Sequence, residues 1–281
     1  MKYLFDNIQT INNLLQSSKR IILLSDYDGT LTPIREHPEL AILPAEIRQL
    51  LVKFTQNKTF FLGIITGRSL KQIKKLIRIP KILYVANHGI ELEGPCIRFT
   101  SAEAKKVRYI LWHVYMQLLK TLKQIEGIYI EDKGLSISLH YRLVKNTHEV
   151  DCINKAIYNI TKSFLDRKML SLSTGKMVYE IRPSVKWNKA SAIQWLLTNY
   201  SPLEFGEDVL LVYLGDDKAD IEVFTTLKGK GLTVFVGNPS DTSAADYYVH
   251  TPEEVKVFLE FLYEQKNEIN HGSHTESKGT V

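Results

Sequence analysis

The chain has 281 residues, a formal net charge of +5 at pH 7, 44% hydrophobic residues and 24% charged residues. These values are ordinary for a globular protein, and the length allows a sizeable core in one or two domains. The two cysteines, Cys96 and Cys152, are too few for a disulfide framework. No stretch approaches the roughly 20 apolar residues of a membrane helix, and the N-terminus lacks a signal-peptide pattern. We therefore expect a cytoplasmic protein that binds neither nucleic acid nor membrane.

Strand-like and helix-like apolar patterns alternate through the first hundred residues. An opening helix is expected over about 3–15, before the first strand. The elements predicted after it are strand 21–25, helix 45–56, strand 60–65, helix 69–77 and strand 82–86. This alternation predicts an α/β fold in which helices flank a parallel sheet.

The pattern changes between about residues 103 and 183. Here a helix, two strands, a second helix and two more strands are predicted, over 107–122, 127–132, 135–142, 147–166, 169–173 and 177–182. A unit of one helix and two strands that occurs twice predicts a small antiparallel sheet with both helices on one face. We interpret it as an insertion, because strands near 209–214, 232–236 and 246–249 then resume the first sheet.

The domain boundaries follow from this order of elements. Residues 1–102 and 184–264 are expected to form a discontinuous core, with residues 103–183 as an inserted α+β domain. The segment 265–281 is polar and without apolar periodicity, so we expect a disordered tail.

The inserted strands alternate between apolar and polar residues. In 135–142 the polar face carries Ser136, Ser138, His140 and Arg142, and in 176–182 the corresponding face carries Lys176, Glu180 and Arg182. Such a face is either an ordinary solvated surface or the inner surface of a lid that closes over a polyhydroxylated ligand.

Two carboxylates follow the first buried strand. Asp26 and Asp28 stand just after the apolar run 21–24, and Gly29 opens the loop. Ligands of open α/β sheets bind beyond the carboxyl ends of such strands. One carboxylate can attack a substrate while the other exchanges protons, and a divalent cation can hold the pair. Alone, the pair is also compatible with a loop cap.

Three further sites follow in chain order. The strand 60–65 delivers Thr66-Gly67-Arg68 to the start of a helix, where a hydroxyl and free N–H groups suit a phosphoryl group or simply cap the helix. Lys189 precedes another helix and can neutralise phosphate, although surface lysines are common. Three acids, Asp216, Asp217 and Asp220, follow the buried strand 209–214, and oxygen ligands of this kind suit Mg²⁺.

Together these four sites resemble the motifs of the haloacid-dehalogenase (HAD) superfamily of phosphohydrolases, over about residues 20–250. The resemblance implies a HAD-like Rossmannoid catalytic core with an inserted cap domain. It implies that Asp26 is the nucleophile, that Asp28 is the general acid and base, and that Thr66 and Lys189 hold the phosphoryl oxygens. It also implies Mg²⁺ on Asp26, the backbone carbonyl of Asp28 and Asp216, with Asp217 and Asp220 as further ligands.

Other segments are similar to the trehalose-6-phosphate phosphatases within that superfamily. They are Asn87-His88-Gly89-Ile90-Glu91, Glu131-Asp132-Lys133-Gly134, His140-Tyr141-Arg142 and Gly175-Lys176 with Glu180 and Arg182. This resemblance implies hydrolysis of trehalose 6-phosphate and places substrate contacts at Gly67, Arg68, Asn87, His88, Glu131, Lys133, Arg142, Lys176 and Glu180. It raises a trehalose-phosphate synthase as a partner and leaves open whether one exists. The family usually has Gly where this chain has Ala190, and Glu222 is displaced by one position.

Three alternatives stay open at this point. A related phosphatase acts on sucrose phosphate, mannosyl-3-phosphoglycerate or a phosphohexose, and Lys133, Arg142 and Glu180 favour trehalose 6-phosphate over these. A non-catalytic sugar-phosphate sensor usually lacks the nucleophile or a metal-binding acid, whereas Asp26, Asp28, Asp216 and Asp220 are all present. A nucleotidyl or glycosyl transferase leaves Thr66 and Lys189 unexplained.

Overall fold

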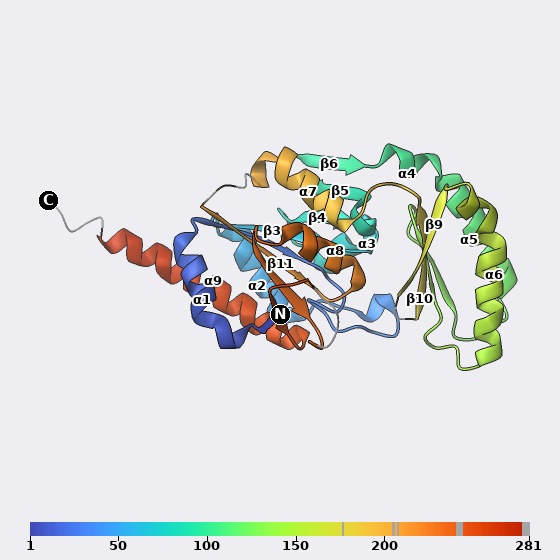
Figure 1. Ribbon diagram of the computed structural model, residues 1–281, viewed down its shortest axis with the longest axis horizontal. Helices are drawn as coiled ribbons and strands as arrows, with labels where there is room; N and C mark the ends of the chain where they lie inside the picture. The colour runs from blue at the N-terminus through green and yellow to red at the C-terminus, as the bar shows by residue number, and fades with distance from the viewer. Residues whose placement is uncertain (176, 204–205, 207, 240–243, 277–281) are drawn as a thin grey trace.

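The computed structural model describes residues 1–175, 177–203, 206, 208–239 and 244–276, and for residues 270–276 it describes only the helical backbone. Two layered units lie side by side along the long axis of the molecule (Figure 1). The larger unit carries both termini and a large twisted sheet, and the smaller one holds a second sheet with helices on its outer side.

The larger sheet has the strand order β1-β13-β12-β11-β2-β3-β4-β5-β6. All pairings from β1 to β4 are parallel, and the hairpin of β5 and β6 adds two antiparallel strands at one edge. The strands are β1 (Lys2–Tyr3), β2 (Arg20–Ser25), β3 (Phe60–Ile65), β4 (Leu83–Ala86), β5 (Glu91–Gly94), β6 (Ile97–Thr100), β11 (Val209–Gly215), β12 (Leu232–Val236) and β13 (Tyr247–Val249).

Helices cover both faces of this sheet, which explains why its central strands are continuous apolar runs. Alternate residues of β2 point to opposite faces, so Ile21 and Leu23 join one buried cluster while Ile22 and Leu24 join the other. The first cluster packs against α1, α2, α3 and α9, and the second against α7 and α8. These helices are α1 (Ile8–Ser17), α2 (Ala45–Gln56), α3 (Leu70–Ile77), α7 (Lys189–Asn199), α8 (Lys218–Leu227) and α9 (Pro252–Glu276).

The smaller unit contains a four-stranded antiparallel sheet in the order β7-β8-β10-β9. One sheet face packs on α5 and α6 around Ile137, Leu139 and Ile181, and the other face is turned toward the core (Figure 1). The elements are α4 (Ala102–Lys106), α5 (Arg108–Leu122), β7 (Tyr129–Asp132), β8 (Ile137–His140), α6 (Thr147–Asp166), β9 (Leu170–Gly175) and β10 (Val178–Pro183).

The predicted fold class is confirmed, and the predicted helices and strands of both units occur near the expected residues. The sequence patterns missed β1 and the hairpin of β5 and β6. Glu91 and Glu93 interrupt the apolar pattern of β5, and these edge strands bury less of their surface than the central ones. Within the described residues, no helix is long and apolar enough to cross a membrane.

The prediction of a disordered tail from residue 265 is wrong for residues 265–276, which continue α9. The physical reason is Lys266, a polar residue by composition that is only 2% exposed. Its ammonium donates to the backbone carbonyls of Leu15, at 2.9 Å, and Ser18, at the C-terminal end of α1. A cation is favourable there because it satisfies orphan carbonyls and the negative end of the helix dipole. The rest of the predicted tail, 277–281, lies outside the described residues.

This contact predicts that Lys266 stabilises the fold. Replacing Lys266 with Met keeps an apolar stem of similar length but removes the ammonium that donates to the Leu15 and Ser18 carbonyls. We expect a loss in the free energy of unfolding on the order of 1–3 kcal/mol, the usual cost of an unpaired buried polar group. Urea unfolding measures it, with the exposed neighbour Glu264→Ala as the control. Equal midpoints for the two variants would contradict the role given to Lys266.

Candidate active site

Chemical groups from four elements meet at one edge of the large sheet. Strands β3, β2 and β11 are adjacent and parallel, so their carboxyl ends bring Thr66, Asp26 and Asp216 together. Lys189 is the first residue of α7, where Asn188 and Ser191 form a capping box that fixes the helix start. The four predicted motifs therefore share one site.

Lys189 is the ionic centre of this site. Its side chain is 2% exposed, and its Nζ donates to Asp26 Oδ1 and to Asp220 Oδ1, both at 2.8 Å. Asp217 Oδ1 lies 3.8 Å away. Burial opposes the charge of this lysine, but the carboxylates outweigh it and raise the pKa of Lys189 well above its usual value. The lysine therefore stays positive.

Asp220 holds the loop after β11 in place. Its carboxylate is fully buried and accepts hydrogen bonds from Lys189, the Tyr213 hydroxyl (2.6 Å), and the backbone N–H groups of Asp216 (3.0 Å) and Asp217 (3.1 Å). Burial raises the pKa of Asp220 to about 6. These four donors make Asp220 a positioning group for the acidic loop.

The pKa values of Asp26 and Asp217 are shifted in opposite directions. Burial raises the pKa of Asp26, and Lys189 opposes that rise. Burial also disfavours the charge of Asp217, but the Lys189 charge and a hydrogen bond with Asp220 lower its pKa to about 2. The Asp217 carboxylate caps α8 through the N–H groups of Ala219 (2.9 Å) and Asp220 (3.1 Å). Its sequence position predicted that Asp217 is a metal ligand. In the structure its hydrogen bonds make it the N-terminal cap of α8.

Three carboxylates are grouped closely enough to bind one metal ion. Oxygen atoms of Asp26, Asp216 and Asp220 all lie within 4.8 Å of one another. Lys189 brings one positive charge to these three acids, so a divalent cation would relieve their mutual repulsion. The loop is built for close approach: Gly29 has a φ of +82°, and any Cβ there would collide with the Asp216 carboxylate. The donor set thus fits a divalent cation that prefers oxygen.

Arg68 contacts Asp28. Its Nε and Nη2 donate to the two oxygens of Asp28 at 2.6 Å each, and Nη2 also donates to the carbonyl of Pro38 at 2.7 Å. The guanidinium lies over the Tyr27 ring, 5.3 Å from its centroid. The side chain of Arg68 is 7% exposed and that of Asp28 is 38% exposed, so the guanidinium is buried while the carboxylate stays accessible. Arg68 therefore orients the carboxylate that was expected to exchange protons.

Thr66, Gly67 and His88 belong to the core and lie where it meets the smaller unit. Thr66 is 1% exposed, and its hydroxyl accepts from the Arg68 N–H at 3.1 Å. A Cβ at Gly67 would lie 2.6 Å from the His88 ring, so only glycine leaves room for that ring. His88 adopts a left-handed conformation with a φ of 56°. Burial lowers the pKa of His88 to about 3, which keeps the ring neutral at physiological pH.

The smaller unit contributes a second ionic cluster. Lys133 Nζ donates to Glu180 Oε1 at 3.0 Å and to the Gly67 carbonyl at 3.1 Å. Ser138 donates to the same Glu180 oxygen, and His88 Nε2 lies 4.0 Å from the other. Neither His88 ring nitrogen nor Glu180 Oε2 has a hydrogen-bond partner among the described residues. These buried polar atoms face one another between the two units.

Other predicted substrate contacts bridge the two units. Ser136 donates to Asn87 Oδ1 at 2.9 Å, and Gln72 donates to Glu131. Arg142 donates to the backbone carbonyl of Arg35 at 2.6 Å, in the same loop that Arg68 contacts at the Pro38 carbonyl. Lys176 lies outside the described residues. The polar face of the small sheet is therefore turned toward the core groups and is not an ordinary solvated face.

Sequence reasoning missed Tyr213 and Gln72 as members of the site. Tyr213 carried one signal, because it is the single hydroxyl in the apolar run 209–214. Gln72 had none beyond its place in the capping box of α3 with Ser69.

The fold, a large mainly parallel sheet with an inserted α+β unit, also occurs in solved structures. A solved structure with this architecture is the C-terminal domain of trehalose-6-phosphate phosphatase from Candida albicans, with a TM-score of 0.77 and 22% identity over 92% of this chain and 97% of that one. The C-terminal domain of the Candida albicans trehalose synthase regulatory protein shares the fold as well, with a TM-score of 0.66 and 14% identity over 91% and 97% of the two chains.

The family follows from the sequence. The family model for trehalose-phosphatase matches residues 24–253. A rice protein (Oryza sativa subsp. japonica) named "Probable trehalose-phosphate phosphatase 2" is 34% identical over 278 residues, covering 90% of this chain and 71% of the relative. The chain belongs to the trehalose-phosphatase family of phosphatases.

The ion pair of Arg68 and Asp28 gives a prediction that a substrate-binding role alone does not. Arg68→Lys keeps the positive charge but cannot hold both Asp28 oxygens. Turnover should fall about ten-fold or more, since positioned proton transfer is worth roughly 10²–10⁴, while the KM changes far less. Steady-state kinetics over a range of pH measures this, with the exposed Arg98→Lys as the control. A raised KM with unchanged turnover and pH profile would instead identify Arg68 as a substrate ligand.

Proposed function

We propose that this protein is a Mg²⁺-dependent phosphatase that hydrolyses trehalose 6-phosphate to trehalose and phosphate through an aspartyl-phosphate on Asp26. The observation that carries the proposal is the contact of Lys189 with Asp26 at 2.8 Å, inside a buried cluster of further carboxylates. A surface lysine or a loop-capping aspartate needs no such burial, and the family supports a phosphatase.

In the first step, Asp26 attacks phosphorus in line with the leaving sugar oxygen. Without substrate, Lys189 donates a hydrogen bond to Asp26. In the substrate complex we expect it to donate to the phosphoryl oxygens instead. The Asp26 oxygen is therefore released for attack only when a phosphate is present to accept the lysine's hydrogen bonds. The Thr66 hydroxyl, whose oxygen already accepts from the Arg68 N–H, is free to donate to the same phosphoryl group.

Asp28 carries the proton in both steps. It protonates the leaving alcohol first and then takes a proton from the water that attacks the aspartyl-phosphate. Asp28 therefore enters the first step as the acid, becomes a carboxylate when it gives its proton to the leaving alcohol, and is restored to the acid by the proton of the water. Arg68 holds the carboxylate form through both oxygens, which orients it for the second step.

The metal in this proposal is Mg²⁺, held by Asp26, Asp216 and the backbone carbonyl of Asp28, with Asp217 and Asp220 supporting the loop. When bound, Mg²⁺ neutralises the phosphate so that an anionic carboxylate can approach it. Asp220 already accepts four hydrogen bonds, so its part is to aim the acidic loop.

Residues 103–183 act as the cap in this proposal and read the sugar. Lys133, Glu180 and His88 lie between the two sheets, and the unpartnered atoms of His88 and Glu180 suit a ligand rich in hydroxyl groups. The resemblance of these residues to the trehalose-6-phosphate phosphatases is what selects trehalose over another sugar. A synthase must supply the substrate, and we propose such a synthase as a partner.

We also propose a cytoplasmic location, which suits the two exposed free cysteines.

The nucleophile is tested by Asp26→Asn. Only the attacking charge is lost, so turnover of trehalose 6-phosphate should drop below about a hundredth of wild type while the circular dichroism and substrate affinity persist. Phosphate release and calorimetric titration with substrate measure both quantities. The exposed Asp6→Asn serves as the matched control and should keep full activity. Substantial turnover by the Asp26 variant would exclude covalent catalysis at this residue.

The metal is tested by chelation and by Asp216→Asn. Wild-type activity should vanish in excess EDTA and return with Mg²⁺, and the variant should need far more Mg²⁺ for half-maximal activity because it loses a charged ligand. Mg²⁺ should also raise the melting temperature of the wild type more than that of the variant. Full activity in excess chelator would contradict the whole assignment.

The sugar reading is tested by Glu180→Gln, which keeps the shape of the side chain but removes its charge. The specificity constant for trehalose 6-phosphate should fall about ten- to a hundred-fold, the worth of a hydrogen bond to a charged group. Hydrolysis of p-nitrophenyl phosphate, which has no second sugar, should change far less, and so should the exposed cap variant Glu126→Gln. Equal losses on both substrates would leave the phosphatase but remove the argument for trehalose.

A further inference from the structure

Helix α5 of the cap is apolar on two sides. Its inner side packs on the cap sheet through five buried residues: Ile110, Leu111, Val114, Leu118 and Leu122. Its outer side carries four large apolar residues that are 69%, 59%, 44% and 37% exposed, which are Tyr109, Trp112, Met116 and Leu119. We call these four residues the α5 stripe.

The α5 stripe has the spacing of a helix-packing seam. Its members are separated by three, four and three positions, so they fall in one line along the helix. A helix on the surface of a globular protein normally has polar residues opposite its buried side, and a helix that is apolar all round is normally covered. Exposed apolar residues gathered in this way mark an interaction site, whereas single ones need no explanation.

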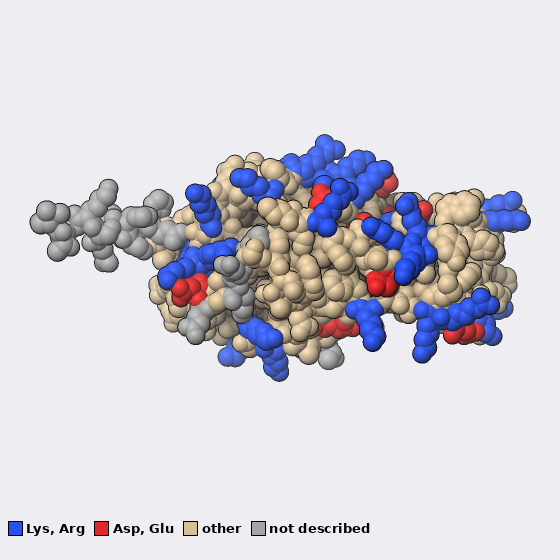
Figure 2. Space-filling view, turned by 90° about the horizontal axis from the view of Figure 1, so that it is seen from above, with Lys and Arg blue, Asp and Glu red and all other residues tan. Residues whose placement is uncertain are grey.

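The charges carried by α5 itself, and by the residues just before and after it, are positive. No Asp or Glu occurs between Glu103 and Glu126, while Lys105 and Arg108 stand at the start of the stripe and Lys120 and Lys123 at its end. Among the described residues, none of the ion pairs involves any of these four cations. Lys and Arg side chains dominate the charged groups on the face of the molecule seen in Figure 2.

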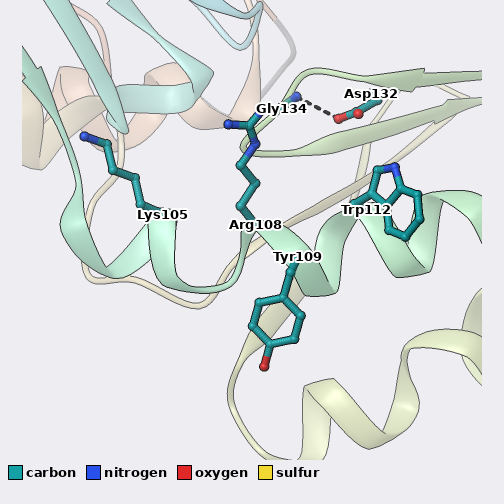
Figure 3. A pocket seen from close by; sticks show the side chains of 6 residues that line it. All are labelled: Lys105, Arg108, Tyr109, Trp112, Asp132 and Gly134. Carbon is teal, nitrogen blue, oxygen red and sulfur yellow. Dashed lines mark hydrogen bonds between the residues drawn. The ribbon is translucent and has the colours of Figure 1, made fainter.

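The first turn of the α5 stripe borders a hollow. Lys105, Arg108, Tyr109 and Trp112 line it from the helices, and Asp132 and Gly134 line it from the turn after β7. In Figure 3 Arg108 reaches toward Gly134, and Trp112 lies below Asp132. Asp132 accepts the Gly134 N–H at 2.8 Å, so the far wall is an ordered turn. The hollow offers a place for one large side chain of a partner, beside the two cations Lys105 and Arg108 and across from the single carboxylate of Asp132.

We propose that the α5 stripe is the docking surface for an acidic amphipathic helix of another protein. The apolar line of such a helix would cover Trp112 and Met116, and its flanking carboxylates would meet Arg108 and Lys120. A second copy of this chain fits poorly, because pairing two α5 helices in either direction brings cations against cations. A membrane also fits poorly, since the stripe is one residue wide and the broad apolar side of α5 is already buried in the cap.

The placement of α5 makes docking compatible with catalysis. The helix covers the face of the cap sheet that is turned away from the core (Figure 1), while Lys133 and Glu180 approach the catalytic groups from the opposite side. Substitutions in the α5 stripe should therefore leave hydrolysis of p-nitrophenyl phosphate unchanged.

The test uses the full chain and a fluorescent three-heptad peptide with Leu at positions a and d and Glu at e and g. Fluorescence anisotropy should show binding to the wild type, and the double variant Trp112→Gln, Met116→Gln should bind about ten-fold or more weakly, as expected for loss of an aromatic anchor. Arg108→Glu with Lys120→Glu should abolish binding. The exposed Tyr158→Gln on α6 should bind as wild type does, and a peptide with Lys in place of Glu should not bind.

Three outcomes overturn the proposal. The first is equal affinity of the acidic peptide for the wild type and for the Trp112, Met116 variant. The second is a dimer in sedimentation velocity that this variant abolishes, which would make a second copy the occupant. The third is flotation of the wild type, but not of the variant, with phosphatidylserine vesicles in the absence of peptide binding, which would make the occupant a lipid surface.

Discussion

The structure depends on the balance of buried charge around Lys189. The sheet edge brings three carboxylates within 4.8 Å of one another, an arrangement that repels itself unless cations and donors compensate. Lys189 supplies one cation, the Tyr213 hydroxyl and two backbone N–H groups neutralise Asp220, and the start of α8 stabilises Asp217. The remaining negative charge favours binding of one more cation. Lys189 can also donate hydrogen bonds to a phosphate.

A second ionic cluster, built on Lys133 and Glu180, lies across the boundary between core and cap. The two clusters are physically separate, since Lys133 contacts the core through the Gly67 carbonyl and Lys189 contacts only core acids. Burial opposes the charge of Glu180, but the Lys133 charge and the hydrogen bond from Ser138 keep its pKa below the usual value. This separation explains how one site can combine a fixed phosphate chemistry with a sugar preference set by an inserted domain.

The sequence predicted the parts that depend on local pattern. Apolar runs placed the central strands, and the residues just after them placed Asp26, Thr66 and Asp216 at one edge. The sequence did not predict which side chains distant in the chain contact one another. The ion pair of Arg68 with Asp28, 40 positions away, was not predicted, because a motif fixes a position and not the partner of a long side chain. Lys266 was read as part of a polar tail, although its ammonium caps α1 from 251 positions away.

The most direct test of this account is to trap the phosphorylated enzyme. Trehalose 6-phosphate labelled in the phosphate group would be mixed with excess enzyme, quenched in acid within one turnover, and the digested protein mapped by mass spectrometry. The account predicts the label on Asp26 of the wild type and no label on the Asp26→Asn variant. Full hydrolysis by the wild type with no label on Asp26 at any time would contradict the central role of the pair Asp26 and Lys189.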